Sequence, residues 1–331
     1  MTEKTETFFK QIRDKRIVVA GDAMLDAYIW GDVKRISPEA PVPVVLVKNK
    51  EYRLGGAANV ALNLKNLGAD PVFVSVVGDD TEGHIFKDIM KVSGLSAEFI
   101  ISSKNRPTTQ KTRIIANNQQ QLLRIDEENT GYLNDYDQTS FIENAIKAIA
   151  GSDAVVFSDY DKGVFSDKVI EKMVDEANRN SIPTIVDPKK RNFLLYKNVS
   201  LFKPNLKELA EGLGIIIQKP VSLKQLNEAS DILFEKMNIS IAFITLSDEG
   251  VFIRNKENSL IIPSHKRSIY DVSGAGDTVA AVAALALSCN SELKMIAELS
   301  NIAGGLVCEK VGVVPIELKE FEEECKRIFS H

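Results

Sequence analysis

The strongest constraint on the fold is an alternation of short apolar runs and helical segments along most of the chain. Residues 16–21 are a short apolar run ended by a glycine, which is typical of a buried strand. Further strands are expected at 71–77, 154–158, 183–186, 200–202, 241–246, 251–254 and 260–263, and helices at 60–67, 82–92, 140–150, 167–179, 206–213, 223–237, 275–289 and 292–309. Strands that alternate with helices predict an α/β fold around a mostly parallel sheet.

Two stretches interrupt this alternation, at about 27–52 and 97–126. The first contains Pro41 and Pro43 ahead of a β-branched run, which favours an edge strand or a lid ribbon over a central strand. The second contains two strand-like runs joined through residues 117–120. We expect the two stretches to form a small β-sheet lid on a single domain that spans residues 1–331; an ordinary surface hairpin is the alternative.

Polar clusters directly follow the predicted strands. They are Asp22 with Asp26, and residues 78–80, 158–160, 187–189, 203–205 and 245–248. In an open parallel sheet, ligands bind outside the carboxyl ends of the strands. Such residues also form turns and helix caps, so one cluster alone decides little. The whole set predicts a ligand cleft along one edge of the sheet.

The most informative cluster is Gly274-Ala275-Gly276-Asp277, at the start of an apolar helix of small residues. The unpaired N–H groups and the positive dipole end of such a helix form an anion site. A carboxylate at this position is explained if the anion is a phosphoryl group that is being transferred and Asp277 accepts the proton of the attacking hydroxyl. The alternative is that Asp277 only complements the helix dipole.

Two further patterns suit a nucleoside triphosphate. Asn205 and Glu208 lie three residues apart at a helix start. There they could bind the water molecules of a magnesium ion, or they could form a capping box that only fixes the helix start. Residues 245–250, TLSDEG, suit the lining of phosphates or a ribose, or a hairpin turn. No GxxxxGK[ST] or GxGxxG motif occurs, which argues against a P-loop and a dinucleotide-binding fold.

Composition excludes several classes of protein. The net charge of -5, without a basic run, gives no reason to expect binding to nucleic acid or to an acidic membrane. The longest apolar run, 279–287, is shorter than the about 20 residues that span a bilayer. Three scattered cysteines and three histidines lack metal-ligand spacing. The start of the chain does not resemble a signal peptide, so we expect a cytoplasmic enzyme.

With these residues in place, the chain resembles the ribokinase-like family of carbohydrate kinases over nearly its whole length. Two family signatures match, GGAANVALNLKNLGA at 55–69 and DVSGAGDT at 271–278. Residues 205–208 and 245–250 fall between them in the expected order. The resemblance implies a three-layer α/β sandwich with a small β-sheet lid, and phosphoryl transfer from ATP to a sugar hydroxyl with Mg²⁺.

The resemblance also implies roles for individual residues. Asp277 is the catalytic base, and Gly274, Ala275 and Gly276 form the anion hole. The nucleotide is bound by Asn205, Glu208, Thr245, Ser247, Gly250 and Asn301, with Glu208 holding Mg²⁺ through water. The sugar is bound by Asp26, Gly55, Gly56 and Asn59. Asp271 lies where some members bind a monovalent cation, which makes K⁺ a further candidate cofactor.

Within this family, four more stretches resemble the heptose-phosphate kinases. They are RISPEAPVPVV at 35–45, NNQQQLLRID at 117–126, SDYDKGVF at 158–165 and VDPK at 186–189. This resemblance implies phosphorylation of D-glycero-D-manno-heptose 7-phosphate at its anomeric hydroxyl to give the 1,7-bisphosphate, in the synthesis of lipopolysaccharide precursors. A phosphorylated substrate needs cations, and the candidates are Arg113, Arg124, Lys162 and Lys189. A solvated surface charge is the alternative for each, least so for Lys189.

Other expectations concern substrates and partners. Another sugar acceptor (ribose, fructose or a phosphofructose) and a sugar or nucleotide sensor without activity are the alternative functions. Many such kinases continue into a nucleotidyltransferase domain; none is recognised before His331, so we expect a separate adenylyltransferase to act downstream. The apolar residues at 42–47 and the open strand edges predict a homodimer through the lid.

Overall fold

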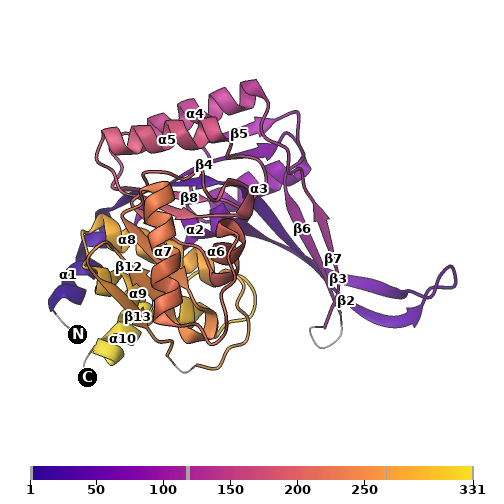
Figure 1. Ribbon diagram of the computed structural model, residues 1–331. Coiled ribbons are helices and arrows are strands. Elements are labelled where there is room, and N and C mark those ends of the chain that lie inside the picture. Colours follow the sequence, from indigo (N-terminus) through magenta and orange to yellow (C-terminus); the bar gives the residue numbers. More distant parts are fainter. Residues whose placement is uncertain (1–2, 117–119, 266, 330–331) are drawn as a thin grey trace.

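The computed structural model describes residues 3–116, 120–265 and 267–329, and these form a large and a small sheet (Figure 1). The large sheet has nine strands, in the order β13 (Ser259–Ile262), β12 (Val251–Arg254), β11 (Ile241–Thr245), β10 (Leu201–Phe202), β9 (Thr184–Asp187), β8 (Ala154–Ser158), β1 (Arg16–Gly21), β4 (Asp70–Gly78) and β5 (Ile100–Ser103). Strands β11 to β5 in this order are parallel, and β12 and β13 extend the sheet as an antiparallel hairpin.

Helices cover both faces of this sheet because its central strands are apolar on both sides. In β1, Ile17 and Val19 belong to one core cluster, and Val18 and Ala20 to the other. The first face carries α1 (Glu3–Gln11), α2 (Ala57–Asn66), α3 (Thr81–Val92), α8 (Ala275–Ser288), α9 (Leu293–Val307) and α10 (Leu318–Phe329). The second carries α4 (Asp135–Ile149), α5 (Asp167–Arg179), α6 (Leu206–Leu213) and α7 (Leu223–Met237). The predicted three-layer α/β fold is confirmed.

The small sheet has four strands, in the order β3 (Pro43–Gly56), β2 (Ala23–Ile36), β6 (Gln110–Ala116) and β7 (Gln120–Glu127). Strand β2 pairs antiparallel with β3 and parallel with β6, so the two interrupting stretches form one sheet and not a lone hairpin. Strand β3, which starts at Pro43, lies at the edge, as its proline predicts. The β2–β3 ribbon extends well beyond the body of the molecule (Figure 1). The predicted turn residues 117–119 lie outside the described residues.

The predicted bounds of the small sheet need correction. Strand β5 pairs in parallel with β4, with Ser75 beside Ile100, so it is the edge strand of the large sheet. Helix α3 is the crossover between these two parallel strands, which is how parallel neighbours are joined. The contribution of the 97–126 stretch to the small sheet therefore starts at Gln110, and β2 and β3 extend the first stretch to residues 23–56.

Helix α8 explains the longest apolar run of the chain. It packs against α2, α9 and the strands β8 and β9, and its residues from Asp277 to Ala286 are all buried. No helix in the described part of the chain is long and apolar enough to cross a membrane. Burial within the protein accounts for the apolar character of α8, and its first turn brings Asp277 to the carboxyl ends of the central strands.

Candidate active site

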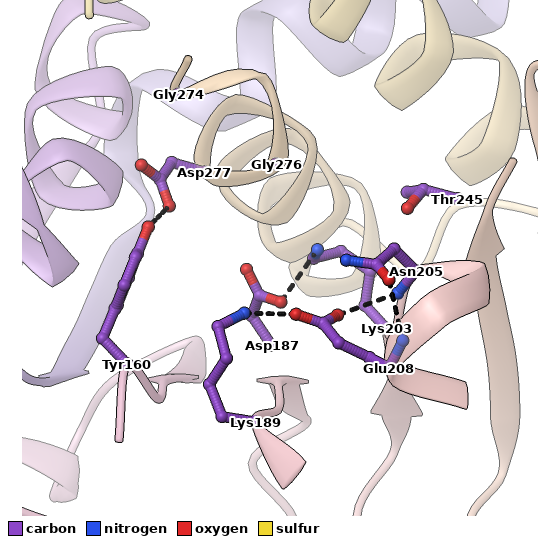
Figure 2. A pocket seen from close by; sticks show the side chains of 10 residues that line it. All are labelled: Tyr160, Asp187, Lys189, Lys203, Asn205, Glu208, Thr245, Gly274, Gly276 and Asp277. Carbon is purple, nitrogen blue, oxygen red and sulfur yellow. Dashed lines mark hydrogen bonds and ion pairs between the residues drawn. The ribbon is translucent and has the colours of Figure 1, made fainter. Parts of the chain in front are cut away.

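A cavity of about 160 Å³ lies at the carboxyl ends of the central strands (Figure 2). It is lined by Tyr160, Asp187, Lys189, Lys203, Asn205, Glu208, Thr245, Gly274, Gly276 and Asp277. Seven of these ten residues are candidates from the sequence. The ten come from the carboxyl ends of the four strands β8 to β11, the first turn of α6 and the start of α8. Small-molecule sites usually have about 300–1,000 Å³. The cavity is therefore the size of a reaction centre and not of a complete nucleotide and sugar.

Asp277 is held by two hydrogen-bond donors from different parts of the fold. Asn59 of α2 donates to Oδ2 over 2.8 Å, and the hydroxyl of Tyr160 donates to Oδ1 (Figure 2). Burial raises the pKa of Asp277 to about 6, although both hydrogen bonds lower it. The residue is only 4% exposed. Asp277 is thus ionised at neutral pH, yet more basic than an ordinary aspartate, which suits a general base.

The start of α8 leaves room for an anion. Gly274 has a φ of 82°, a left-handed conformation that favours glycine, and a Cβ there would lie 2.9 Å from Nδ2 of Asn59. A Cβ on Gly276 would meet Nζ of Lys203 only at 3.9 Å, so this glycine opens the cavity toward a cation. The amide of Ala275 donates to the carbonyl of Val272 over 3.3 Å, so this member of the predicted anion hole is already engaged in a turn.

Two lysines of the cavity are paired with carboxylates. Nζ of Lys203 lies 3.1 Å from Asp187, and both side chains are buried. Lys189 is paired with Glu208 (Figure 2). Burial lowers the pKa of Lys189, but Asp187 and Glu208 outweigh it and raise this pKa above its usual value. Both lysines therefore bring positive charge to the cavity, beside the positive end of α8.

The capping-box alternative for Asn205 and Glu208 is present in the structure. Oδ1 of Asn205 accepts from the amide of Glu208 over 2.8 Å, and Oε2 of Glu208 accepts from the amide of Asn205 over 2.9 Å. The box fixes the start of α6, and with it the carboxylate that faces Lys189. It does not exclude a second role in the cavity, because both side chains line it.

The predicted sugar-binding residues lie beside this cavity, where β2 and β3 meet the large sheet. Asp26 of β2 is buried, and its Oδ1 accepts from Arg113 over 2.6 Å. A Cβ on Gly55 would lie 2.2 Å from Oδ2 of Asp26, so the glycine makes room for this carboxylate. Gly56 has a φ of 57° and lies against the carbonyl of Asp22. Asn59 is buried against Asp277, a contact that the sequence did not predict.

Residues 14–319 match the family model described as pfkB family carbohydrate kinase. The chain belongs to this family. Membership confirms the predicted enzyme class, an ATP-dependent carbohydrate kinase, and the ribokinase-like family resemblance.

Curated relatives and solved structures agree with the family. The chain is 38% identical to the bifunctional protein HldE of Campylobacter curvus and 40% identical to that of Aliarcobacter butzleri, over 93% of its own length in both cases. It spans only 64% and 63% of the length of these two relatives. Phosphofructokinase-2 from Escherichia coli in complex with potassium has a TM-score of 0.79 at 17% identity, covering 96% of this chain and 99% of that one. Arabidopsis thaliana ribokinase complexed with ribose and ATP has a TM-score of 0.70 at 17% identity, covering 94% of this chain and 98% of that one. At this identity, the two structures show the fold alone.

Three residues predicted to bind the nucleotide do not line the cavity. Ser247 and Gly250 form the turn between β11 and β12, with φ of 59° and 100°. A Cβ on Gly250 would lie 2.1 Å from the carbonyl of Ile262, so the hairpin itself requires this glycine. Asn301 of α9 donates to the carbonyl of Pro263 over 2.8 Å. Their role toward a nucleotide stays a prediction of the family resemblance.

The other predicted cations and Asp271 are also engaged within the protein. Lys162 lies 3.0 Å from Glu128, and Arg124 lies 2.9 Å from Asp126. Asp271 accepts from the amide of Ser273 over 2.9 Å and from that of Gly312 over 3.0 Å. These two amides fix the carboxylate of Asp271 between the loops that precede α8 and follow α9.

Sequence reasoning did not select Tyr160, Asp187 or Lys203 as site residues, although all three line the cavity. Each belongs to a polar cluster that follows a predicted strand. The sequence therefore predicts their position at the edge of the sheet, but it does not predict their hydrogen-bond and ion-pair partners. The hydroxyl of Tyr160 reaches a carboxylate that is 117 residues away in the sequence.

The cavity fits a magnesium ion that is bound mostly by phosphates and water. Among the residues that the structure describes, no group of three or more His, Cys, Asp or Glu side chains could hold a metal ion. Mg²⁺ is usually bound by one or two carboxylates together with several waters and substrate phosphates. Glu208 offers one such carboxylate at the edge of the cavity, and Lys189 and Lys203 offer the cationic surroundings that phosphates require.

Proposed function

We propose that this chain transfers the γ-phosphoryl group of ATP to the anomeric hydroxyl of D-glycero-D-manno-heptose 7-phosphate, giving the 1,7-bisphosphate. The observation that supports it best is the buried carboxylate of Asp277 between two hydrogen-bond donors, at a helix start that faces two lysines. This arrangement suits a base that takes a hydroxyl proton beside a site for a phosphoryl group.

In the proposed mechanism, Asp277 accepts the proton of the sugar hydroxyl on a carboxylate oxygen, while Asn59 donates a hydrogen bond to Oδ2. The start of α8 at Gly276 and the ammonium group of Lys203 stabilise negative charge on the transferred group. Bound ATP and Mg²⁺ supply the phosphoryl group and further positive charge. Glu208 would orient the water shell of the metal.

The choice of a heptose phosphate rests on similarity and on the lid. The curated relatives carry the name bifunctional protein HldE, and the lid stretches of the sequence resemble heptose-phosphate kinases. At the base of the lid, the guanidinium groups of Arg53 and Arg113 lie 4.9 and 5.3 Å from the ring centre of Tyr28. Arg113 also pairs with Asp26 over 2.6 Å, and Arg53 pairs with Glu51. Such a cluster suits a ligand with both hydroxyls and a phosphate.

A panel of acceptors tests this function. ADP release is measured with ATP and Mg²⁺ and each of D-glycero-D-manno-heptose 7-phosphate, ribose, fructose, fructose 6-phosphate and fructose 1-phosphate. We expect turnover with the heptose phosphate and little with the others. Preference for ribose or a fructose phosphate would overturn the assignment of the acceptor and leave the role of Asp277 intact. Tight ATP binding without ADP release for any sugar would favour a sensor.

Two further properties belong to this proposal. K⁺ would bind near Asp271, and ADP release in KCl against an equal concentration of tetramethylammonium chloride tests that. We also propose a homodimer through the lid, because the lid exposes the large apolar side chains of Ile36, Val42, Leu46, Val47, Leu123 and Ile125. Light scattering of the protein beside a Leu46→Lys variant tests the dimer; a monomer in both would refute it.

A further inference from the structure

The contact between Tyr160 and Asp277 points to a device that orients the base. Tyr160 follows β8, and its ring stands at the wall of the cavity with the hydroxyl toward Asp277 (Figure 2). Nζ of Lys189 lies 5.5 Å from the centre of this ring. The hydroxyl donates to Oδ1 of Asp277 while Asn59 donates to Oδ2, so the two donors hold both carboxylate oxygens in place.

The hydroxyl of Tyr160 acts as a donor and not as a second base. Burial raises the pKa of Tyr160 well above its usual value, and the charge of Asp277 raises it further. The tyrosine therefore keeps its proton around neutral pH, where Asp277 is ionised. The other charged groups facing Asp277 are Asp187 and Lys203, which are paired with each other over 3.1 Å. In the described part of the chain, Tyr160 is the titratable group that donates a hydrogen bond directly to the base.

The position of Tyr160 is set in turn by Asp22, a buried residue at the end of β1 with no role in the mechanism above. Its carboxylate accepts from three backbone amides of one loop: Tyr160 over 2.8 Å, Lys162 over 3.2 Å and Val164 over 3.2 Å. These three hydrogen bonds to one carboxylate fix the backbone conformation of the loop of residues 160–164. Because the first of them is the amide of Tyr160 itself, Asp22 fixes the backbone from which the ring reaches Asp277.

We propose that Tyr160 is a positioning residue for the base Asp277, and that Asp22 acts through Tyr160 by shaping the loop of residues 160–164. The proposal rests on the proposed function of Asp277 and adds two residues that touch neither the transferred group nor the nucleotide in that mechanism. Tyr160 would keep the carboxylate oriented and favour its ionised form. Asp22 would matter for turnover only as long as the hydroxyl of Tyr160 is present.

The first test is the titration of Asp277 in Tyr160→Phe, which removes one hydroxyl and keeps the ring. Hydrogen bonds to charged groups are strong enough to shift a pKa by roughly one unit, so we expect the pKa of Asp277 to rise by about that much. It is read by ¹³C NMR of aspartate-labelled protein, with the resonance assigned by its loss in Asp277→Asn. The matched control is Tyr196→Phe, which loses a buried hydroxyl that donates to Asp159 over 2.7 Å. An unchanged pKa in Tyr160→Phe, or an equal rise in Tyr196→Phe, would overturn the proposal.

The second test is a double-mutant cycle on kcat with Asp22→Asn, or Asp22→Ser if the first variant does not fold. We expect Tyr160→Phe to lower kcat roughly tenfold at pH 7, to shift the acid limb of the pH profile to higher pH, and to leave the KM for ATP within about twofold. Changing Asp22 in the Tyr160→Phe background should then cost little more. Multiplied losses in the double variant would refute the role of Asp22. If no acceptor gives ADP, the proposed function fails, while the NMR titration still decides the contact between Tyr160 and Asp277.

Discussion

Asp277→Asn is expected to make the protein more stable and much less active. Burial raises the pKa of Asp277 from 3.8 to about 6 in the folded protein. At about 1.36 kcal/mol per pKa unit, ionising this carboxyl in the fold at pH 7 costs about 3 kcal/mol. Asparagine has the same shape without the charge, and Asn59 can still donate to its oxygen. We therefore expect the free energy of unfolding at pH 7 to rise by up to about 3 kcal/mol.

This gain depends on pH in a definite direction. Because the pKa of Asp277 is raised in the fold, the folded protein holds the proton more tightly than the unfolded chain between pH 3.8 and about 6. The wild-type protein therefore loses stability relative to Asp277→Asn as the pH rises through this interval. The difference should be small near pH 4 and reach its full size above about pH 6.

Two assays on the same preparations test both halves of this prediction. Urea unfolding followed by circular dichroism gives the stability difference between pH 4.5 and pH 8. ADP release at saturating ATP gives kcat, which should fall at least about a hundredfold, since general-base catalysis contributes about 10²–10⁴. A variant that is less stable than the wild type at pH 7, or that keeps kcat within tenfold, would refute the reasoning.

Three other substitutions have expected outcomes. Gly274→Ala places a methyl group at a positive φ and 2.9 Å from Nδ2 of Asn59, so kcat should fall at least about tenfold with little change in the KM for ATP; a wild-type kcat would contradict this. Arg113→Met should raise the KM for the heptose phosphate at least about tenfold, which is the scale of a lost charge-assisted contact. The control is Arg124→Met at an exposed arginine, which should leave this KM within about twofold. Equal effects of the two substitutions would refute a substrate site at Arg113. Glu208→Gln should raise the Mg²⁺ concentration needed for half-maximal ADP release, and EDTA should abolish turnover in both proteins; an unchanged Mg²⁺ dependence would remove Glu208 from the metal site.

The alternation of strands and helices was predictable because it depends on local patterns. Short apolar strands such as β1 and β8 are buried on both faces, so their sequences are continuous apolar runs. The edge at which their polar neighbours gather then follows from the topology of a parallel sheet. The edge of the sheet that holds the cavity therefore follows from local sequence patterns alone.

Elements that depend on distant partners were not predictable in the same way. Helices α1 and α10 are polar amphipathic segments at opposite ends of the chain. Phe9 of α1 packs on Phe321 of α10 with ring centres 5.3 Å apart. Each segment has too few apolar residues to predict a buried helix face without the other. Strand β5, with four residues, is likewise recognised only by its pairing with β4.

The same limit applies within the site. The sequence singles out Asp277 because its glycines and its helix are local features. It cannot show that Asn59 and Tyr160 converge on this carboxylate, because they are 218 and 117 residues away from it. Contacts of this kind set the orientation and the pKa of the base, and they require the fold to be known.

The central claim is phosphoryl transfer to the anomeric hydroxyl of a heptose phosphate, and the position of the new phosphate tests it most directly. The protein is incubated with ATP, Mg²⁺ and D-glycero-D-manno-heptose 7-phosphate, and the product is examined by ³¹P NMR. We predict a second phosphate ester whose resonance is coupled to the anomeric proton, formed by the wild type and not by Asp277→Asn. A phosphate on another carbon, no new ester, or equal product from Asp277→Asn would contradict the account.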